Sequence, residues 1–159
     1  MLDRSQTIER SPTPLEPTPS GDVQPRRRAD FETLGDALDY AAIGLRGFNF
    51  HDARGTLVRA YPYAELRDDA LAMARRFAAL GLVKGDRLAL VAETGPEFAA
   101  VFFGAVYAGL WPVPLPLPTS FGGRDAYVEQ LVVMLGSSDP KLFLYPPDQI
   151  GRASCRERV

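Results

Sequence analysis

The sequence predicts an α/β fold: a partial, open and mostly parallel sheet with flanking helices, preceded by a disordered leader. Helical and strand-like patterns alternate after a first helix in the order β-β-α-β-α-β-α-β, which is typical of an open α/β sheet. The run 88–92 is almost continuously apolar, as in a strand covered on both faces. Residues 1–29 lack apolar periodicity and hold five prolines, so they cannot bury enough surface to fold.

Composition excludes several classes of protein. The chain has 159 residues and a net charge of −2, so it holds at most one ordinary domain and shows no basic surface for nucleic acid. The run Arg26–Arg28 is interpreted as part of a solvated linker. The uncharged stretch 98–123 is interrupted by Pro112, which leaves too few residues for a transmembrane segment of about 20.

The chain divides into three parts. Residues 1–29 are the disordered Pro-rich leader and 30–148 the folded part. Residues 149–159 are interpreted as an artefactual tail, because the run from Ile150 to Val159 resembles a translated sequencing adapter; a genuine basic tail is the alternative. The single cysteine, Cys155, lies in this tail and gives no disulfide framework, which favours the cytoplasm.

The first half of the folded part predicts a helix, a hairpin and a second helix. Thr33 and Asp36 have the spacing of a capping box, and the first helix should end near Gly44 or Gly47. The predicted apolar face of this first helix consists of Leu34, Ala37, Leu38, Ala41, Ala42 and Leu45. The predicted apolar face of the second helix consists of Leu66, Ala70, Met73, Phe77 and Leu80. Between them, 48–51 and 56–61 flank the turn 52–55 of a β-hairpin, and Gly81 should cap the second helix.

The second half predicts the sheet. The run 88–92 is a predicted strand. Thr94 and Glu97 have the spacing of a capping box for the next helix, at 98–109. This helix is apolar on all sides, so we expect it to be buried between layers. Prolines at every second position from 112 to 118 remove the N–H groups along one edge, so this segment can be a strand only at a sheet edge or a polyproline-like exit. A helix at 125–135 and a strand at 141–145 complete the order.

Several pieces of sequence in this order resemble the N-terminal subdomain of the adenylate-forming (AMP-binding, acyl-CoA synthetase) superfamily. They are Tyr63-Ala64-Glu65-Leu66, Gly85-Asp86-Arg87, Glu97-Phe98, Gly104-Ala105-Val106-Tyr107-Ala108-Gly109 and Pro112-Val113-Pro114-Leu115-Pro116. Leu115-Pro116-Leu117-Pro118, Phe121-Gly122-Gly123-Arg124 and Ser137-Ser138-Asp139-Pro140 resemble its fatty acyl-AMP ligase branch most. The resemblance covers residues 31–148.

The resemblance implies that the full-length parent uses ATP and Mg²⁺ to convert a fatty acid to an acyl adenylate. It also implies transfer of the acyl group to an acyl carrier protein or a polyketide or peptide synthase. The family's phosphate loop, ribose-binding acid and catalytic lysine lie downstream of this chain. We therefore expect no catalytic, cofactor-binding or metal-binding residue here, no bound cofactor, and no activity of the fragment alone.

Four possible substitutes for those residues are less favoured than structural roles. Gly122-Gly123-Arg124 lacks a phosphate-loop pattern, and His51 is interpreted as a solvated turn residue rather than a base. Asp68 and Asp69 are interpreted as solvated charges on a helix. The aromatic residues Phe98, Phe102, Phe103 and Tyr107 fit packing on the sheet better than one wall of an acyl tunnel.

Two other functions remain open at this point. An acyl-CoA synthetase fragment is the neighbouring enzyme, because the features that separate the two branches lie beyond residue 148. A small non-catalytic α/β module, complete near this length, is the alternative from another class.

Overall fold

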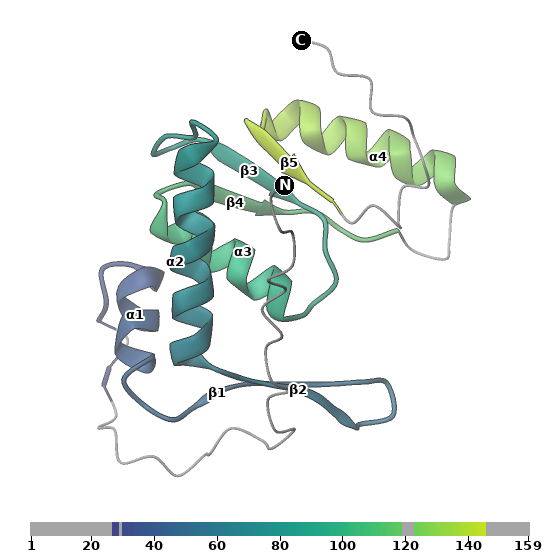
Figure 1. The fold of residues 1–159 in the computed structure, drawn as a ribbon. Coiled ribbons are helices and arrows are strands. Elements are labelled where there is room, and N and C mark those ends of the chain that lie inside the picture. Colours follow the sequence, from purple (N-terminus) through teal and green to yellow (C-terminus); the bar gives the residue numbers. More distant parts are fainter. Residues whose placement is uncertain (1–26, 29, 119–122, 146–159) are drawn as a thin grey trace, which may run out of the picture.

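The structure is a computed structural model and describes residues 27–28, 30–118 and 123–145. Within them the predicted α/β fold with an open, mostly parallel sheet is confirmed (Figure 1). Most of the predicted leader and all of the predicted tail lie outside the described residues, so both stay predictions. In the described part, no helix combines the length and apolar character that crossing a membrane requires.

Helix α1 (Leu34–Ala41) begins at the predicted capping box. The Thr33 hydroxyl accepts a hydrogen bond from the Asp36 N–H at 3.1 Å, and the Asp36 carboxylate accepts one from the Thr33 N–H at 3.0 Å. The predicted end near Gly44 or Gly47 is wrong, because the chain tightens after Ala41 into turns closed by shorter-range bonds. Leu45 lies beyond this end and is exposed; Leu34, the first residue of α1, is exposed as well, while Leu38 is buried.

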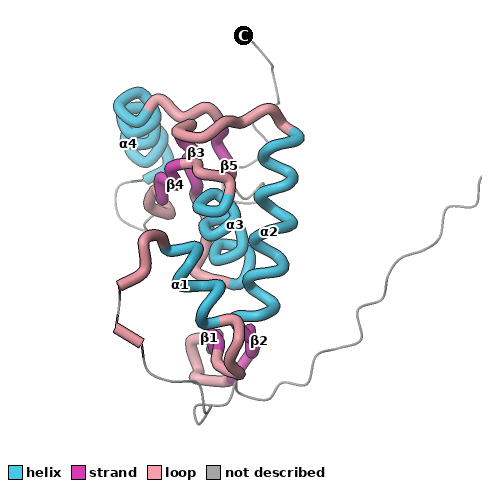
Figure 2. The backbone as a smooth tube through the Cα atoms, turned by 90° about the vertical axis from the view of Figure 1, so that its left-hand side faces the viewer, coloured by secondary structure: helices cyan, strands magenta, loops and turns pink. Residues whose placement is uncertain are grey.

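The predicted hairpin is confirmed as the antiparallel strands β1 (Gly47–His51) and β2 (Leu57–Pro62). Its turn is stabilised by Asp52, whose carboxylate accepts hydrogen bonds from the N–H groups of Arg54 and Thr56 at 2.9 and 2.8 Å. Figure 2 shows that the hairpin lies at the N-terminal end of the long helix α2 (Tyr63–Ala79) and that the parallel sheet lies near its C-terminal end.

Helix α2 buries Leu66, Ala70 and Phe77 as predicted. Gly81 has a φ of 81°, and the Leu82 N–H donates to the Phe77 carbonyl at 3.2 Å, which confirms the glycine cap. Leu80 was expected on the buried face and is 67% exposed. It caps the helix just before the turn at Gly81, and Leu82 packs against the core in its place.

The parallel sheet has the order β4-β3-β5, with β3 (Arg87–Leu90) in the centre, β4 (Trp111–Pro114) and β5 (Leu142–Leu144) at the edges. Leu88 and Leu90 face one layer, together with Phe77 of α2 and a residue of α3 (Pro96–Tyr107). Val91 faces the other layer, with residues of α4 (Gly123–Ser138). The nearly continuous apolar run therefore predicted coverage on both faces correctly.

Strand β4 is an edge strand, as its alternating prolines predicted. The N–H groups of Trp111 and Leu115 donate to the carbonyls of Asp86 and Leu90, both at 2.8 Å. Because alternate residues bond to the same neighbour, Pro112 and Pro114 lie on the outer side, where no donor is needed.

Two predictions for α3 are wrong. Its N-cap is Gly95, without any side-chain capping bond, rather than the predicted capping box of Thr94 and Glu97. Pro96 occupies the first helical position and favours an extended conformation at Gly95, so the helix starts one residue later than the box requires. The helix is also not buried all round: its buried positions are Ala99, Ala100, Gly104 and Ala105, and its phenylalanines are half-buried.

Candidate functional site

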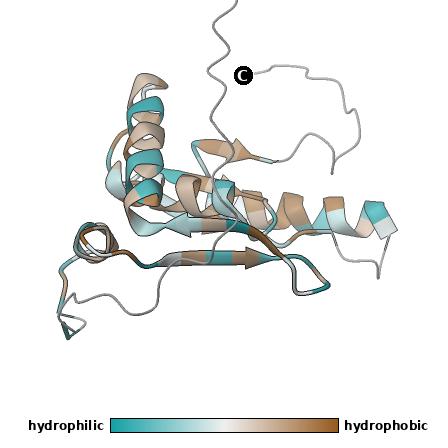
Figure 3. Ribbon diagram, turned by 60° about the horizontal axis from the view of Figure 1, so that its bottom comes forward, coloured by the Kyte–Doolittle hydropathy of each residue, from teal (hydrophilic) through white to brown (hydrophobic). Residues whose placement is uncertain are grey.

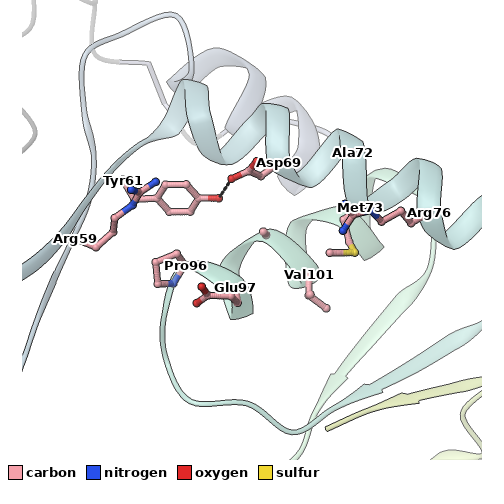
Figure 4. A pocket seen from close by; sticks show the side chains of 10 residues that line it. Arg59, Tyr61, Asp69, Ala72, Met73, Arg76, Pro96, Glu97 and Val101 are labelled. Atoms are coloured by element: carbon pink, nitrogen blue, oxygen red, sulfur yellow. Dashed lines mark hydrogen bonds between the residues drawn. The ribbon is translucent and has the colours of Figure 1, made fainter. Parts of the chain in front are cut away.

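The described residues form a polar cleft of about 600 Å³ where β2, α2 and the start of α3 meet (Figure 4). Tyr61, at its inner end, donates a hydrogen bond to the Asp69 carboxylate at 2.9 Å. The cleft is lined by Arg59, Tyr61, Asp69, Ala72, Met73, Arg76, Pro96, Glu97, Ala100 and Val101.

One of the two arginines that line the polar cleft is paired within the chain. Arg59 forms an ion pair with Glu65 of α2 and lies 5.5 Å from the centre of the Tyr61 ring. Burial and the hydrogen bond to Asp69 raise the pKa of Tyr61, so its phenol stays protonated and acts as a donor rather than a base. These contacts hold the hairpin on α2.

Asp69 was predicted to be a solvated charge together with Asp68, and this is wrong for Asp69. Its carboxylate is partly buried in the polar cleft and accepts from Tyr61, whereas Asp68 is exposed. The sequence signal was available, since Asp69 and Met73 lie one helical turn apart on a face next to the buried stripe. What periodicity could not show was that β2 crosses this face.

A second polar group, the three-helix node, joins α1, α2 and α3 through Asp39, Arg67 and Tyr107. The Asp39 carboxylate accepts hydrogen bonds from Arg67 at 2.6 Å and from the Tyr107 hydroxyl at 2.7 Å. Burial alone would raise the pKa of Asp39, but these two hydrogen bonds outweigh it and hold the pKa below its ordinary value. Tyr107 was grouped with the phenylalanines of α3 from sequence, yet its polar end serves this node.

The node predicts an acid dependence of stability. Because the pKa of Asp39 is lower in the folded chain than in the unfolded one, its ionised form stabilises the fold above about pH 4, and this contribution is lost as the pH falls through the lowered pKa. We expect Asp39→Asn to reduce the free energy of unfolding by about 1 kcal/mol or less at pH 7, because the side chain is 45% exposed. Urea unfolding from pH 7 to pH 3 should show the variant and the wild type converging.

Asp68→Asn is the matched control for this measurement, since Asp68 is the next residue along α2 and its side chain is 79% exposed. It should leave the free energy of unfolding almost unchanged at every pH. A gap between wild type and Asp39→Asn that stays constant down to pH 3 would contradict the role given to the ionised carboxylate.

The other candidates from sequence are not brought together. His51 ends β1 and is exposed, and the described residues contain no group of three His, Cys, Asp or Glu that could hold a metal ion. Gly123 and Arg124 begin α4, whereas Gly122 lies outside the described residues. The polar cleft has no Ser, Thr, Cys or His among its lining residues, so it lacks a nucleophile and base pair of the Ser–His or Cys–His kind.

Comparisons with known proteins identify the class. The model of the family described as AMP-binding enzyme matches residues 50–158. A provisionally named acyl-CoA synthetase of Caulobacter vibrioides is 47% identical over 129 residues, 81% of this chain and 23% of its own length. The acyl-CoA ligase sidI of Aspergillus fumigatus is 33% identical over 131 residues, 79% of this chain and 20% of its own length.

Solved structures agree with the sequence relatives. One from a study of fatty acyl-adenylate ligases from E. coli and L. pneumophila is 47% identical, with a TM-score of 0.72 over 75% of this chain and 21% of that one. An adenylation domain of a keto acid-selecting NRPS module is 26% identical, with a TM-score of 0.58 over 70% of this chain and 21% of that one. The fold and its relatives thus place this chain in the adenylate-forming class of proteins. The chain belongs to the AMP-binding enzyme family, and it spans about a fifth of the length of these relatives.

Proposed function

We propose that this chain is the N-terminal part of a fatty acyl-AMP ligase. The full-length enzyme would join a fatty acid to ATP in a Mg²⁺-dependent reaction, releasing pyrophosphate, and pass the acyl group from the adenylate to the thiol of a carrier protein. The observation that carries the proposal is the 47% identity to a fatty acyl-adenylate ligase structure at a TM-score of 0.72. The single cysteine supports a cytoplasmic location.

The chemistry explains what this part does not supply. A carboxylate must approach a phosphate, so the site needs Mg²⁺, cations and backbone N–H groups to neutralise the transition state. Among the described residues there is no group of three His, Cys, Asp or Glu that could hold a metal ion, and Arg59, one of the arginines in the polar cleft, is paired with Glu65. The chain would therefore act as scaffold for a reaction carried out by residues beyond it.

An acyl-CoA synthetase is the second candidate. The Caulobacter relative bears that name and is also 47% identical to this chain. Both enzymes would form the same acyl adenylate, so the acceptor of the acyl group is what separates them. A small non-catalytic α/β module is the third, and a reading frame that stops soon after residue 148 would support it.

The acceptor can be tested with the full-length parent, a radiolabelled fatty acid and ATP. We expect an acyl adenylate to form and to be consumed by a holo acyl carrier protein about tenfold faster or more than by coenzyme A, because the site must discriminate between the two thiols. A carrier protein without its phosphopantetheine thiol is the matched control.

Two results would contradict the proposal. Equal or faster consumption by coenzyme A would identify an acyl-CoA synthetase. Absence of any adenylate over a range of fatty acids would contradict both enzyme assignments.

A further inference from the structure

An apolar groove of about 290 Å³ lies between the hairpin and α3, separate from the polar cleft. Two of its phenylalanines come from β1 and three from α3, and Figure 3 shows hydrophobic (brown) and hydrophilic (teal) residues mixed along the hairpin. The groove is lined by Phe48, Phe50, Thr94, Gly95, Phe98, Ala99, Phe102 and Phe103.

The rings form continuous walls. Phe98 and Phe102 stack with centres 6.0 Å apart, and Phe102 meets Phe103 edge-on at 5.7 Å. On the hairpin, Phe48 and Phe50 lie two residues apart and therefore on the same face, with ring centres at 5.9 Å. None of the five rings is fully buried, and Phe48 is 37% exposed. The groove thus presents a continuous apolar surface that two elements share.

The lining favours a protein segment over a small ligand. Pockets for small molecules combine apolar walls with a few polar groups that fix the orientation of the ligand, and they usually hold 300–1,000 Å³. The groove lies at the lower limit of that range, has no charged residue, and offers a side-chain hydroxyl from Thr94 alone. A fatty acid would thus find one side-chain hydroxyl and no cation among the lining residues to bind its carboxylate, whereas a packed segment needs only complementary apolar shape.

The length of the related proteins indicates where a segment that fills the apolar groove would come from. This chain spans 23% and 20% of its two curated relatives and 21% of the most similar of the structures described above, so most of a related enzyme lies outside it. We propose that the apolar groove receives an uncharged, apolar segment from the part of the parent enzyme that follows this chain. This inference rests on the family and the chain length, not on the acceptor proposed above.

Thiol labelling can test this docking. Phe48→Cys or Phe102→Cys is introduced in a background in which Cys155 and any further cysteines are serine. Labelling by a maleimide is then followed in the chain and in the full-length enzyme. Ile43→Cys, at a position 77% exposed, and Phe77→Cys, at a position 2% exposed, set the fast and slow limits in the chain. We expect fast labelling at Phe48 and Phe102 in the chain and labelling about tenfold slower or more in the full-length enzyme without any ligand.

Each other outcome overturns the proposal. Equally fast labelling in both proteins would mean that no segment covers the groove. Fast labelling of the full-length enzyme that slows only after a long-chain fatty acid is added would identify a ligand site instead. Two labelled positions keep the test decisive if one substitution disturbs the fold. Measuring adenylate formation on the same samples distinguishes a failure of docking from a failure of the proposed function.

Discussion

Exchange of pyrophosphate with ATP in the presence of a fatty acid is expected for the full-length parent and is expected to be undetectable for residues 1–159 alone. Exchange requires a phosphate site, a metal site and cations that act on the transition state. In the described residues the polar cleft carries a protonated tyrosine, arginines and carboxylates, but neither a phosphate loop nor a metal-binding cluster. The measurement is incorporation of labelled pyrophosphate into ATP at matched protein concentrations.

The control for this comparison is the parent with its fatty acid omitted, which sets the background of the assay. Saturable exchange by the chain alone would contradict the prediction if a single substitution between residues 31 and 148 abolished it. That result would mean that a catalytic site lies within the described fold.

Gly104→Ala should destabilise the chain by about 1–3 kcal/mol, the usual cost of overpacking a core. Gly104 lies where α3 crosses α2 most closely. A Cβ atom at this position would lie 2.7 Å from the Met73 Cβ, 2.9 Å from its Cγ and 3.0 Å from the Ala70 carbonyl oxygen. The Ala70 carbonyl oxygen is a backbone atom and cannot move aside as a flexible side chain can, so α2 and α3 must move apart to admit the methyl group. Urea unfolding measures the effect as a change in the free energy of unfolding, with the dependence of that free energy on urea concentration (the m-value) unchanged between variant and wild type.

Gly136→Ala is the matched control, because Gly136 is also helical and a Cβ there would meet nothing within 4 Å. Alanine should stabilise α4 by about 0.5–1 kcal/mol through its better helix propensity. The two substitutions add the same methyl group and should shift stability in opposite directions. A stabilising Gly104→Ala would contradict the close crossing of α2 and α3.

The sequence predicted the order of elements well because local patterns determine them. The capping box of Thr33 and Asp36, the turn at Asp52 and the glycine cap at Gly81 each depend on residues a few positions apart. The alternating prolines from Pro112 onward predicted an edge strand because a missing N–H limits pairing whatever the surroundings.

The errors fall where distant elements meet. Asp69 was assigned to a polar face; its position one helical turn from Met73 placed it beside the buried stripe, but the helix pattern could not show that Tyr61 of another element would donate a hydrogen bond to it. The phenylalanines of α3 were assigned to packing on the sheet, and Phe98 does pack against the cluster that contains Leu88 of β3, but all three also line a groove with the hairpin that the pattern did not predict. Such contacts depend on how elements cross in space, which spacing along the chain does not specify.

The prolines of β4 have a consequence for how copies of this sheet could associate. Strand β4 has no donor at Pro112 or Pro114, so its outer side cannot complete a ladder with another strand. Strand β5 pairs with β3 alone among the described strands, and its outer side carries the N–H of Phe143. A sheet with one closed and one open edge can join a second copy edge to edge, but it cannot add a third. Among the described strands, the outer side of β5 is therefore the edge that retains a free backbone donor, and joining two copies of this chain through it would leave no such edge for a third.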